Sequence, residues 1–283
     1  MTPKPVLAWL NQNEYGSIVS QQSLAGGCIN NGSRIKMSSG ANFFLKTNSN
    51  APKDMFAREA EGLDELRSGA GLRFPETYLV GADFLLLEDL SPASPAADYW
   101  ETLGMQLAHL HQRTKPQFGF ASDNYIGSTP QPNPWTENGF EFFAEHRLAY
   151  QTRLARDNGL FSSKEAEMVD RLTTHLPDLL PDQNASLIHG DLWSGNVIAD
   201  SDGQPALIDP AAHFGWREAD LGMSQLFGPF DERCYQAYEN VFPLESGWKQ
   251  RLPLYNLYHL LNHLNLFGRS YHRQILDILH RFA

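Results

Sequence analysis

Along the first ninety residues, short apolar runs alternate with turn residues at the spacing of β-strands. The runs YGSIVSQQSLAGG, SRIKMSSG and ANFFLKTN are separated by glycines, which favour tight turns. Residues 53–69 instead carry an apolar residue every three to four positions, which predicts a helix that ends at Gly69. The runs ETYLVGA and DFLLLEDL predict two more strands, the second of them central and buried because its apolar residues are uninterrupted. We therefore expect an antiparallel sheet with one helix.

From Ser91 onward the apolar residues follow a helical period. The segment SPASPAAD is typical of a connector, so we expect two domains, residues 1–90 and 91–283. Residues 118–139 are rich in Gly, Pro and Asn and predict a long surface loop. Helices are expected near 96–115, 137–158, 163–179, 217–226, 231–241 and 248–281, the last of them broken at Gly268.

Composition and charge restrict the partners of this chain. Its formal net charge is −11 and it has no basic stripe, which argues against nucleic acid. No run is long and apolar enough to predict a membrane span, and the N-terminus lacks a signal-peptide pattern. Cys28 and Cys234 are too few for a disulfide framework. These features predict a soluble, cytoplasmic protein with a small-molecule partner and no membrane partner.

The stretch LIHGDLWSGNVI, residues 187–198, places polar residues inside what otherwise reads as a pair of buried strands. Asp191 and Asn196 lie five positions apart, and Asp209 follows thirteen positions later. Phosphoryl transfer requires a carboxylate that accepts the proton of the attacking hydroxyl and oxygen ligands for Mg²⁺. A sheet followed by a helical lobe with these residues is the order of a protein-kinase-like phosphotransferase. We expect Asp191 to be the base and Asn196 and Asp209 to be the Mg²⁺ ligands.

Two residues upstream complete this set. Lys46 ends a predicted strand, and Glu59 lies one turn into the predicted helix. An ion pair between them would hold the lysine against the phosphates of ATP. A lysine after apolar residues is by itself usually only the end of a strand. The order of all five residues along the chain, rather than any one of them, indicates a nucleotide site.

Longer motifs resemble one family of kinases over nearly the whole chain. The segments HGDLWSGN, LIDPAAHFGWREADLGM, FFAEHRL, GFASDNYIGSTPQPNPW and LNHLNLFGRSY are similar to those of fructosamine kinases, also called ketosamine-3-kinases. The resemblance implies a bilobal α+β protein-kinase-like fold, with a small sheet lobe and a larger helical lobe. It also implies transfer of the γ-phosphate of ATP to the 3-hydroxyl of a ketosamine, either free or on a glycated protein lysine, which promotes deglycation.

The resemblance further implies residues that cover and flank the nucleotide. Gly26 and Gly27 match the turn over the phosphates, where glycine permits close approach of the backbone. Cys28 follows them, and its thiolate would be favoured by backbone amides and by Lys46. Oxidation there, including a disulfide between two copies, would block nucleotide entry, so we expect a monomer or a redox-linked homodimer; the alternative is a small buried residue. The hinge that meets the adenine edge is expected at Glu88, Asp89 and Leu90.

For the acceptor, the resemblance implies contacts from Trp193, Asn262 and His263. The tryptophan would stack on the sugar or on the stem of a glycated lysine, unless it only packs beneath the loop. The histidine has an alternative as a satisfied core residue. Weaker candidates are Trp135, Glu218 and Asp220, the last of which could equally anchor the loop that carries the base.

Three rival functions differ in how well the sequence supports them. A kinase of another small hydroxyl compound, such as an aminoglycoside or homoserine, would share the HGD motif. A pseudokinase that only binds partners is disfavoured because the metal-ligand and base residues occur together. A metal-dependent hydrolase built on His259 and His263 lacks a third ligand.

Overall fold

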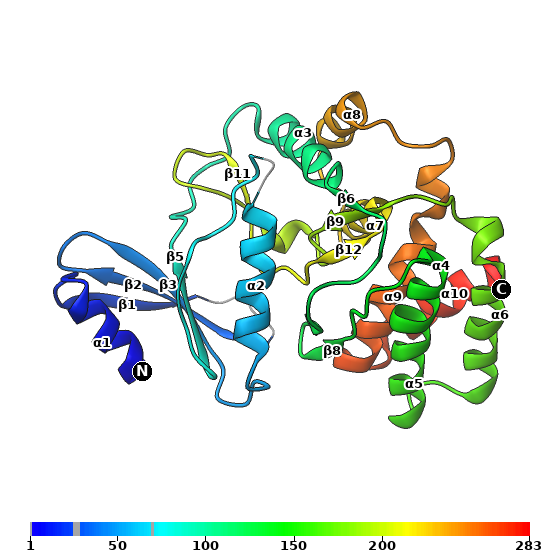
Figure 1. Ribbon diagram of the computed structural model, residues 1–283, viewed down its shortest axis with the longest axis horizontal. Coiled ribbons are helices and arrows are strands. Elements are labelled where there is room, and N and C mark those ends of the chain that lie inside the picture. Colours follow the sequence, from blue (N-terminus) through cyan, green and yellow to red (C-terminus); the bar gives the residue numbers. More distant parts are fainter. Residues whose placement is uncertain (1, 25–28, 69–70) are drawn as a thin grey trace.

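The computed structural model describes residues 2–24, 29–68 and 71–283. Its N-terminal part is a five-stranded antiparallel sheet with the order β1-β2-β3-β5-β4. Figure 1 shows α1 beside this sheet and α2 between the sheet and the remaining helices. The elements of this part are α1 Lys4–Gln12, β1 Ile18–Leu24, β2 Asn31–Met37, β3 Asn42–Thr47, α2 Met55–Arg67, β4 Thr77–Val80 and β5 Phe84–Glu88.

The apolar run of β5 is buried because both faces of the sheet are covered. Side chains alternate between the two faces of a strand. Leu86 packs in one cluster with Val6 and Leu10 of α1, whereas Leu85 and Leu87 belong to the larger core that continues into α2 and the helical part. The sequence predicted this central strand correctly. It did not predict α1, whose two buried residues are too few to form a helical pattern.

The C-terminal part is mainly helical. The break expected at Gly268 is confirmed, since this residue has a φ of +86° between α9 and the next turn. The stretch expected as one helix over 137–158 is continuous but contains a π-helical segment, η1. The helices of the C-terminal part are α3 Tyr99–His111, α4 Gly139–Phe143, η1 Ala144–Ala149, α5 Tyr150–Asp157, α6 Ser163–Leu179, α7 Arg217–Leu226, α8 Glu232–Val241, α9 Trp248–Phe267 and α10 His272–Phe282. The same part contains the short 3₁₀ turns η2 Ser194–Asn196 and η3 Arg269–Tyr271.

The prediction of a long surface loop over 118–139 is wrong. The segment contains a hairpin of β7 Asn124–Ile126 and β8 Thr129–Gln131 and carries buried polar side chains. Asn124 Nδ2 donates to Ala212 O at 2.8 Å, and Gln131 Nε2 donates to Ala211 O at 3.1 Å. Side-chain amides thus satisfy backbone groups that a longer sheet would otherwise pair. The polar residues that suggested an exposed loop instead allow the segment to be buried, because their side chains pair with backbone groups.

The two buried strands read within 187–198 are present, but they do not pair with each other. The strand β9 Ala185–Ile188 pairs with β12 His213–Gly215 and β6 Thr114–Lys115. The strand β10 Val197–Ala199 pairs with β11 Pro205–Leu207 in a separate sheet. The polar stretch between β9 and β10 therefore crosses from one small sheet to another.

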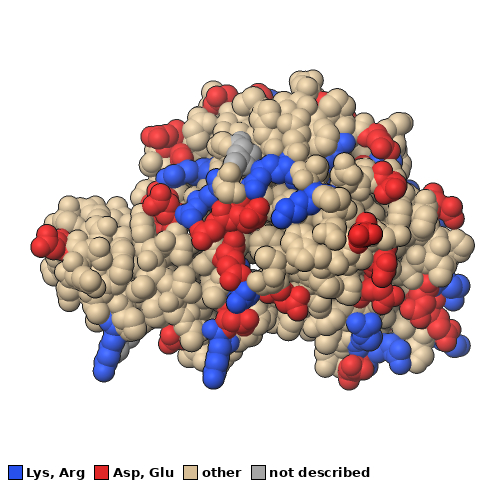
Figure 2. Space-filling model, in the orientation of Figure 1, with Lys and Arg blue, Asp and Glu red and all other residues tan. Residues whose placement is uncertain are grey.

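Charged side chains of both signs lie side by side along α2, where the two parts meet (Figure 2). Arg113 after α3 donates to Glu65 of α2 at 2.9 Å and to the Ser68 hydroxyl at 2.9 Å. Near the other end of α2, the Tyr125 hydroxyl donates to Asp54 at 2.7 Å. These contacts fix the helix that carries Glu59 to the C-terminal part. Within the described ranges, no helix combines the length and apolarity needed to cross a bilayer.

Candidate functional site

A cleft of about 800 Å³ opens between the sheet and the helical part. It collects residues from both parts that are far apart in the sequence. Gly26, Gly27 and Cys28 lie outside the described residues, so their expected place over the phosphates stays a prediction. Apart from the three weaker candidates, the other expected site residues line the cleft: Lys46, Glu59, Glu88, Asp89, Leu90, Asp191, Trp193, Asn196, Asp209, Asn262 and His263.

Lys46 of β3 lines the cleft and contacts one carboxylate from α2 and one from the segment after β11. Its Nζ is 2.5 Å from Glu59 Oε1 of α2 and also contacts the carboxylate of Asp209. Burial by itself would lower the pKa of Lys46, but the two carboxylates outweigh it and raise the pKa above the ordinary value. The ammonium group is therefore charged at neutral pH.

Asp191 and Asn196 form a second contact in the cleft. The Asn196 amide nitrogen donates to the Asp191 carboxylate at 3.1 Å and to the Asp191 backbone oxygen at 2.9 Å. This contact orients the carboxylate and leaves the amide oxygen of Asn196 available. Burial, together with the nearby charge of Asp209, raises the pKa of Asp191 to about 7. A carboxylate with such a pKa is a competent proton acceptor near neutral pH.

Asp220 of α7 anchors the loop that carries Asp191 through hydrogen bonds to the loop backbone. The carboxylate of Asp220 accepts the backbone N–H of His189 at 2.7 Å and that of Gly190 at 2.9 Å, and it also contacts His111 at 3.2 Å. Gly190 has a φ of +81°, and a side chain there would place its Cβ 2.2 Å from Ala211 O, so the loop requires glycine at this position. Of its two expected roles, Asp220 thus has that of loop anchor.

His189 joins this loop to the strand end before Asp209. Its Nδ1 accepts the backbone N–H of Asp191 at 3.2 Å, so its Nε2 carries the proton that is donated to Ile208 O at 3.0 Å. Burial lowers the pKa of His189, which favours this neutral form. The neutral ring therefore fixes the spacing of the two expected site aspartates.

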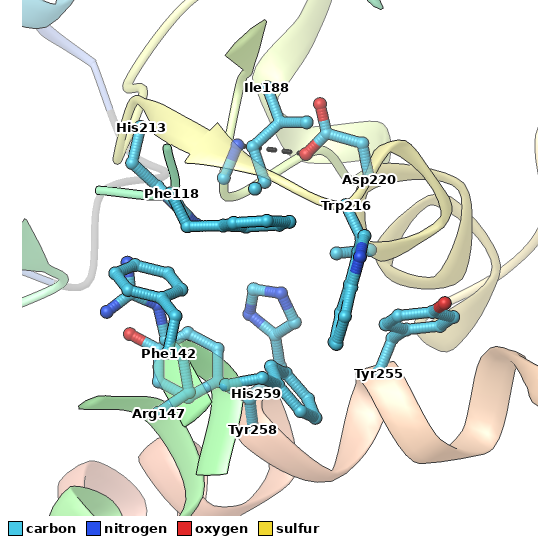
Figure 3. Close-up of a pocket in the computed structure, with 14 residues that line it drawn as sticks. Phe118, Phe142, Arg147, Ile188, His213, Trp216, Asp220, Tyr255, Tyr258 and His259 are labelled. Atoms are coloured by element: carbon cyan, nitrogen blue, oxygen red, sulfur yellow. Dashed lines mark hydrogen bonds between the residues drawn. The ribbon is translucent and has the colours of Figure 1, made fainter. Parts of the chain in front are cut away.

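Behind the loop lies a small cavity of about 20 Å³. Figure 3 shows Phe118 and Asp220 above it and His259, Tyr258 and Arg147 below it. This volume has room for about one water molecule. The cavity is therefore too small for a substrate and belongs to the support of the loop.

At the other end of the cleft, the side chains of the expected hinge are engaged in ion pairs. Asp89 Oδ2 is 2.6 Å from Arg34 Nε, and Glu88 pairs with Arg73. The Glu88 backbone N–H donates to Glu76 O at 2.8 Å. Recognition of a base at this edge would consequently fall to backbone groups at the end of β5 and directly after it.

The expected acceptor residues lie on the helical wall of the cleft. The Trp193 ring lies over Gly195, where an added Cβ would come within 2.3 Å of it. His263 donates from Nδ1 to His259 O at 2.7 Å, which leaves Nε2 without the proton in the neutral ring. Asn262 is buried, and its amide oxygen accepts from Gln151 at 3.3 Å.

All three weaker candidates lie outside the cleft; Asp220 is the loop anchor already described. Trp135 packs against Phe214 and Lys115, and Glu218 is buried in an ion pair with Arg251 at 2.6 Å. Sequence reasoning also missed cleft residues, because single aromatic residues at helix ends give no pattern of their own. The missed residues on the C-terminal side of the cleft include Tyr125 and Ile126 of β7 together with Phe227, Leu266, Phe267 and Tyr271.

A divalent ion would find two oxygen donors here. Asn196 offers its free amide oxygen, and Asp209 offers its half-exposed carboxylate. Magnesium binds hard oxygen ligands and usually keeps several waters, so this donor set fits it when phosphates supply the rest. Among the residues that the structure describes, no group of three or more His, Cys, Asp or Glu is placed to hold a metal.

The chain resembles known proteins over nearly its full length. The model of the fructosamine kinase family matches residues 4–283. The chloroplastic protein-ribulosamine 3-kinase of Arabidopsis thaliana is 36% identical over 290 residues, which cover 99% of this chain and 87% of that protein. A candidate ketoamine kinase of Synechocystis is 42% identical, covering 93% of this chain and 90% of that protein.

Solved structures confirm the expected kinase-like fold. A candidate fructosamine-3-kinase from Thermobifida fusca has a TM-score of 0.89 and 32% identity, covering 99% of this chain and 98% of that one. A choline kinase from Streptococcus pneumoniae, with a TM-score of 0.67, 16% identity and 99% of each chain covered, shares the fold alone. Because the family model spans nearly all of the sequence and two relatives exceed 30% identity over most of it, the chain belongs to the fructosamine kinase family.

Proposed function

We propose that this kinase transfers the γ-phosphate of ATP to the 3-hydroxyl of ketosamines. The observation that carries the proposal is the convergence of Lys46, Glu59, Asp191, Asn196 and Asp209 in one cleft. A protein that only binds a partner has no physical need for a charged lysine, a raised carboxyl pKa and two metal donors in one place. The similarity of the chain to a ketoamine kinase and a ribulosamine kinase supports the acceptor class.

Asp191 is the proposed general base. Its carboxylate accepts a hydrogen bond from the 3-hydroxyl and takes the proton as the oxygen bonds to the γ-phosphorus. The bond from that phosphorus to the bridging oxygen breaks, and ADP leaves with its electron pair. Asn196 keeps the carboxylate pointed into the cleft throughout.

Lys46 is the proposed phosphate ligand, held in place by Glu59. Asn196 and Asp209 would hold Mg²⁺, which supplies charge stabilisation for the transferring phosphoryl group. Gly26 and Gly27 are proposed to cover the phosphates, and the backbone at Glu88, Asp89 and Leu90 to bind the adenine. On the acceptor side, Trp193, Asn262 and His263 are the proposed contacts.

The product explains why such a phosphorylation would promote deglycation. When the phosphorylated ketosamine tautomerises to the form with a double bond between its first two carbons, the phosphate on the third carbon becomes an allylic leaving group. It departs more readily than hydroxide, and hydrolysis then frees the amine. We propose both free ketosamines and glycated protein lysines as acceptors, with the reaction in the cytoplasm.

Phosphorus NMR of the products tests the proposal. ATP, Mg²⁺ and a panel of ketosamines built on fructose, ribulose, psicose and erythrulose should give ADP and a phosphate ester coupled to the proton on the third carbon. A matched ketosamine without the 3-hydroxyl is the control and should give no ester. Transfer to an aminoglycoside or homoserine with no transfer to any ketosamine would contradict the proposed function.

A further inference from the structure

Five aromatic rings line the outer part of the helical wall of the cleft, and we call them the aromatic wall. They are Trp193 and His263 together with Phe227 after α7, Phe267 at the end of α9 and Tyr271 in η3. Their ring centroids form one connected group. Phe227 lies 4.9 Å from His263 and 6.0 Å from Trp193, and Tyr271 lies 5.0 Å from His263.

This wall keeps apolar surface in contact with solvent. Phe267 is 45% exposed and Phe227 is 38% exposed, although both have aromatic neighbours. Single exposed apolar residues are common on protein surfaces and need no explanation. Here they are contiguous and line a concave site next to Asp191, which is the arrangement of a ligand contact.

The charges around the wall favour a cation. Within the described chain, every lysine and arginine that lines the cleft comes from the N-terminal part: Arg34, Lys46 and Arg58. The helical part contributes the carboxylates of Asp191 and Asp209. Burial lowers the pKa of His263, so its ring is neutral at pH 7 and does not repel a positive charge.

We propose that the aromatic wall binds the amine portion of the ketosamine and selects amines with an aliphatic or aromatic stem. The inference rests on the proposed function and specifies its substrates. The protonated secondary amine lies against ring faces, where cation–π attraction stabilises it, and the stem covers Phe227 and Phe267. An α-amino acid glycated on its α-amine is disfavoured, because its carboxylate has no cation to pair with on this wall.

An acceptor series with one sugar and different amines tests this selectivity. The 1-deoxyfructosyl derivatives of benzylamine, of Nα-acetyl-lysine through its side chain, and of glycine keep the reacting hydroxyl constant. We expect kcat/KM for the first two to exceed that for the glycine derivative by roughly tenfold, the scale of one or two aromatic contacts with a stem that the glycine derivative lacks.

Variants of Phe227 and Phe267 test whether these two exposed rings cause the selectivity between amines. Phe227→Ala and Phe267→Ala should each reduce the benzylamine-to-glycine ratio by roughly three- to tenfold, through KM rather than kcat. Phe267→Leu keeps an apolar side chain and the packing but removes the ring face, so it should recover only part of the ratio. The control is Met105→Ala on α3, which removes a side chain of similar exposure, 43%, outside the cleft and should leave the ratio unchanged.

The outcomes separate this inference from the proposed function. Ketosamine turnover with equal kcat/KM across the series, or ratios unchanged in both phenylalanine variants, would overturn the aromatic wall as the amine site and leave the kinase activity standing. Circular dichroism of each variant checks that it is folded. If no ketosamine is phosphorylated while ATP still binds, the proposed function fails, and this inference fails with it.

Discussion

Asp220 accepts the backbone N–H of Gly190 at 2.9 Å, so the loop that carries Asp191 is held by a carboxylate on another helix. The side chain of Asp191 is therefore free for chemistry and is not the support of its own loop. This separation makes substitutions at Asp191 informative, because they leave the anchoring contacts intact.

Asp191→Asn should lower kcat by about a hundredfold or more, the usual scale for loss of a general base. The affinity for ATP should stay close to that of the wild type, since the proposed nucleotide contacts come from other residues. Steady-state kinetics and calorimetric titration of ATP measure the two quantities. Asp178→Asn, at an 82% exposed side chain, is the matched control. A variant at Asp191 with near wild-type turnover would remove its assignment as the base.

Trp193→Ala should raise KM for the ketosamine and leave KM for ATP nearly unchanged, because the ring lies on the helical wall. Gly195→Ala should have the same selective effect, since its Cβ would come within 2.3 Å of the Trp193 ring and displace it. Kinetics with each substrate varied in turn measure both variants. Equal losses for ATP and acceptor would mean that the tryptophan only supports the loop.

Arg147→Ala should lower the free energy of unfolding by about 2–4 kcal/mol, from lost packing and unpaired oxygens. Arg147 is buried and donates to Pro132 O and to the Asn133 side chain, both at 2.7 Å, so it holds the 118–139 segment in place. Denaturant unfolding measures the change. Arg153→Ala, at an exposed position of the same helical stretch, is the control. Equal stability of the two variants would contradict the role of Arg147.

The buried histidines should make the fold less stable below about pH 6.5, the ordinary pKa of the side chain. Burial lowers the pKa of His259 to about 3, so below its unfolded value the unfolded chain takes up a proton that the folded chain does not. Stability is thus present above that value and is lost as the pH falls. The free energy of unfolding of the wild type should fall with decreasing pH. His259→Gln should reduce this slope by about 1.4 kcal/mol per pH unit between about pH 5.5 and about pH 4.5. An unchanged slope would contradict this coupling.

Cys28 carries a prediction that rests on the sequence. The sequence leads us to expect this thiolate to be favoured by backbone amides of the glycine turn and by Lys46, so it should react with peroxide and block nucleotide entry. Activity should fall on oxidation and return with a reductant, and Cys28→Ala should resist the loss. Size-exclusion chromatography without reductant tests for a disulfide-linked dimer. Equal inactivation of wild type and variant would exclude Cys28 as a switch.

The sequence predicted those features that depend on neighbours along the chain. Helices over 163–179 and 217–226 begin and end where their apolar period does. The order of Lys46, Glu59, Asp191, Asn196 and Asp209 indicated one site, because phosphoryl transfer restricts which residue types can serve it. Both kinds of information lie in the order of residue types along the chain, so they can be read without a fold.

Only the tertiary structure decided features that depend on contacts between distant residues. Asp220 became a loop anchor because α7 brings it beneath His189, and residues 118–139 became buried because Ala211 and Ala212 accept their amides. The aromatic wall joins Phe227 to His263, which belong to different helical segments and show no common pattern. The contact partner of a single ring or polar side chain cannot be predicted from the sequence, because burial and pairing arise only when distant segments pack together.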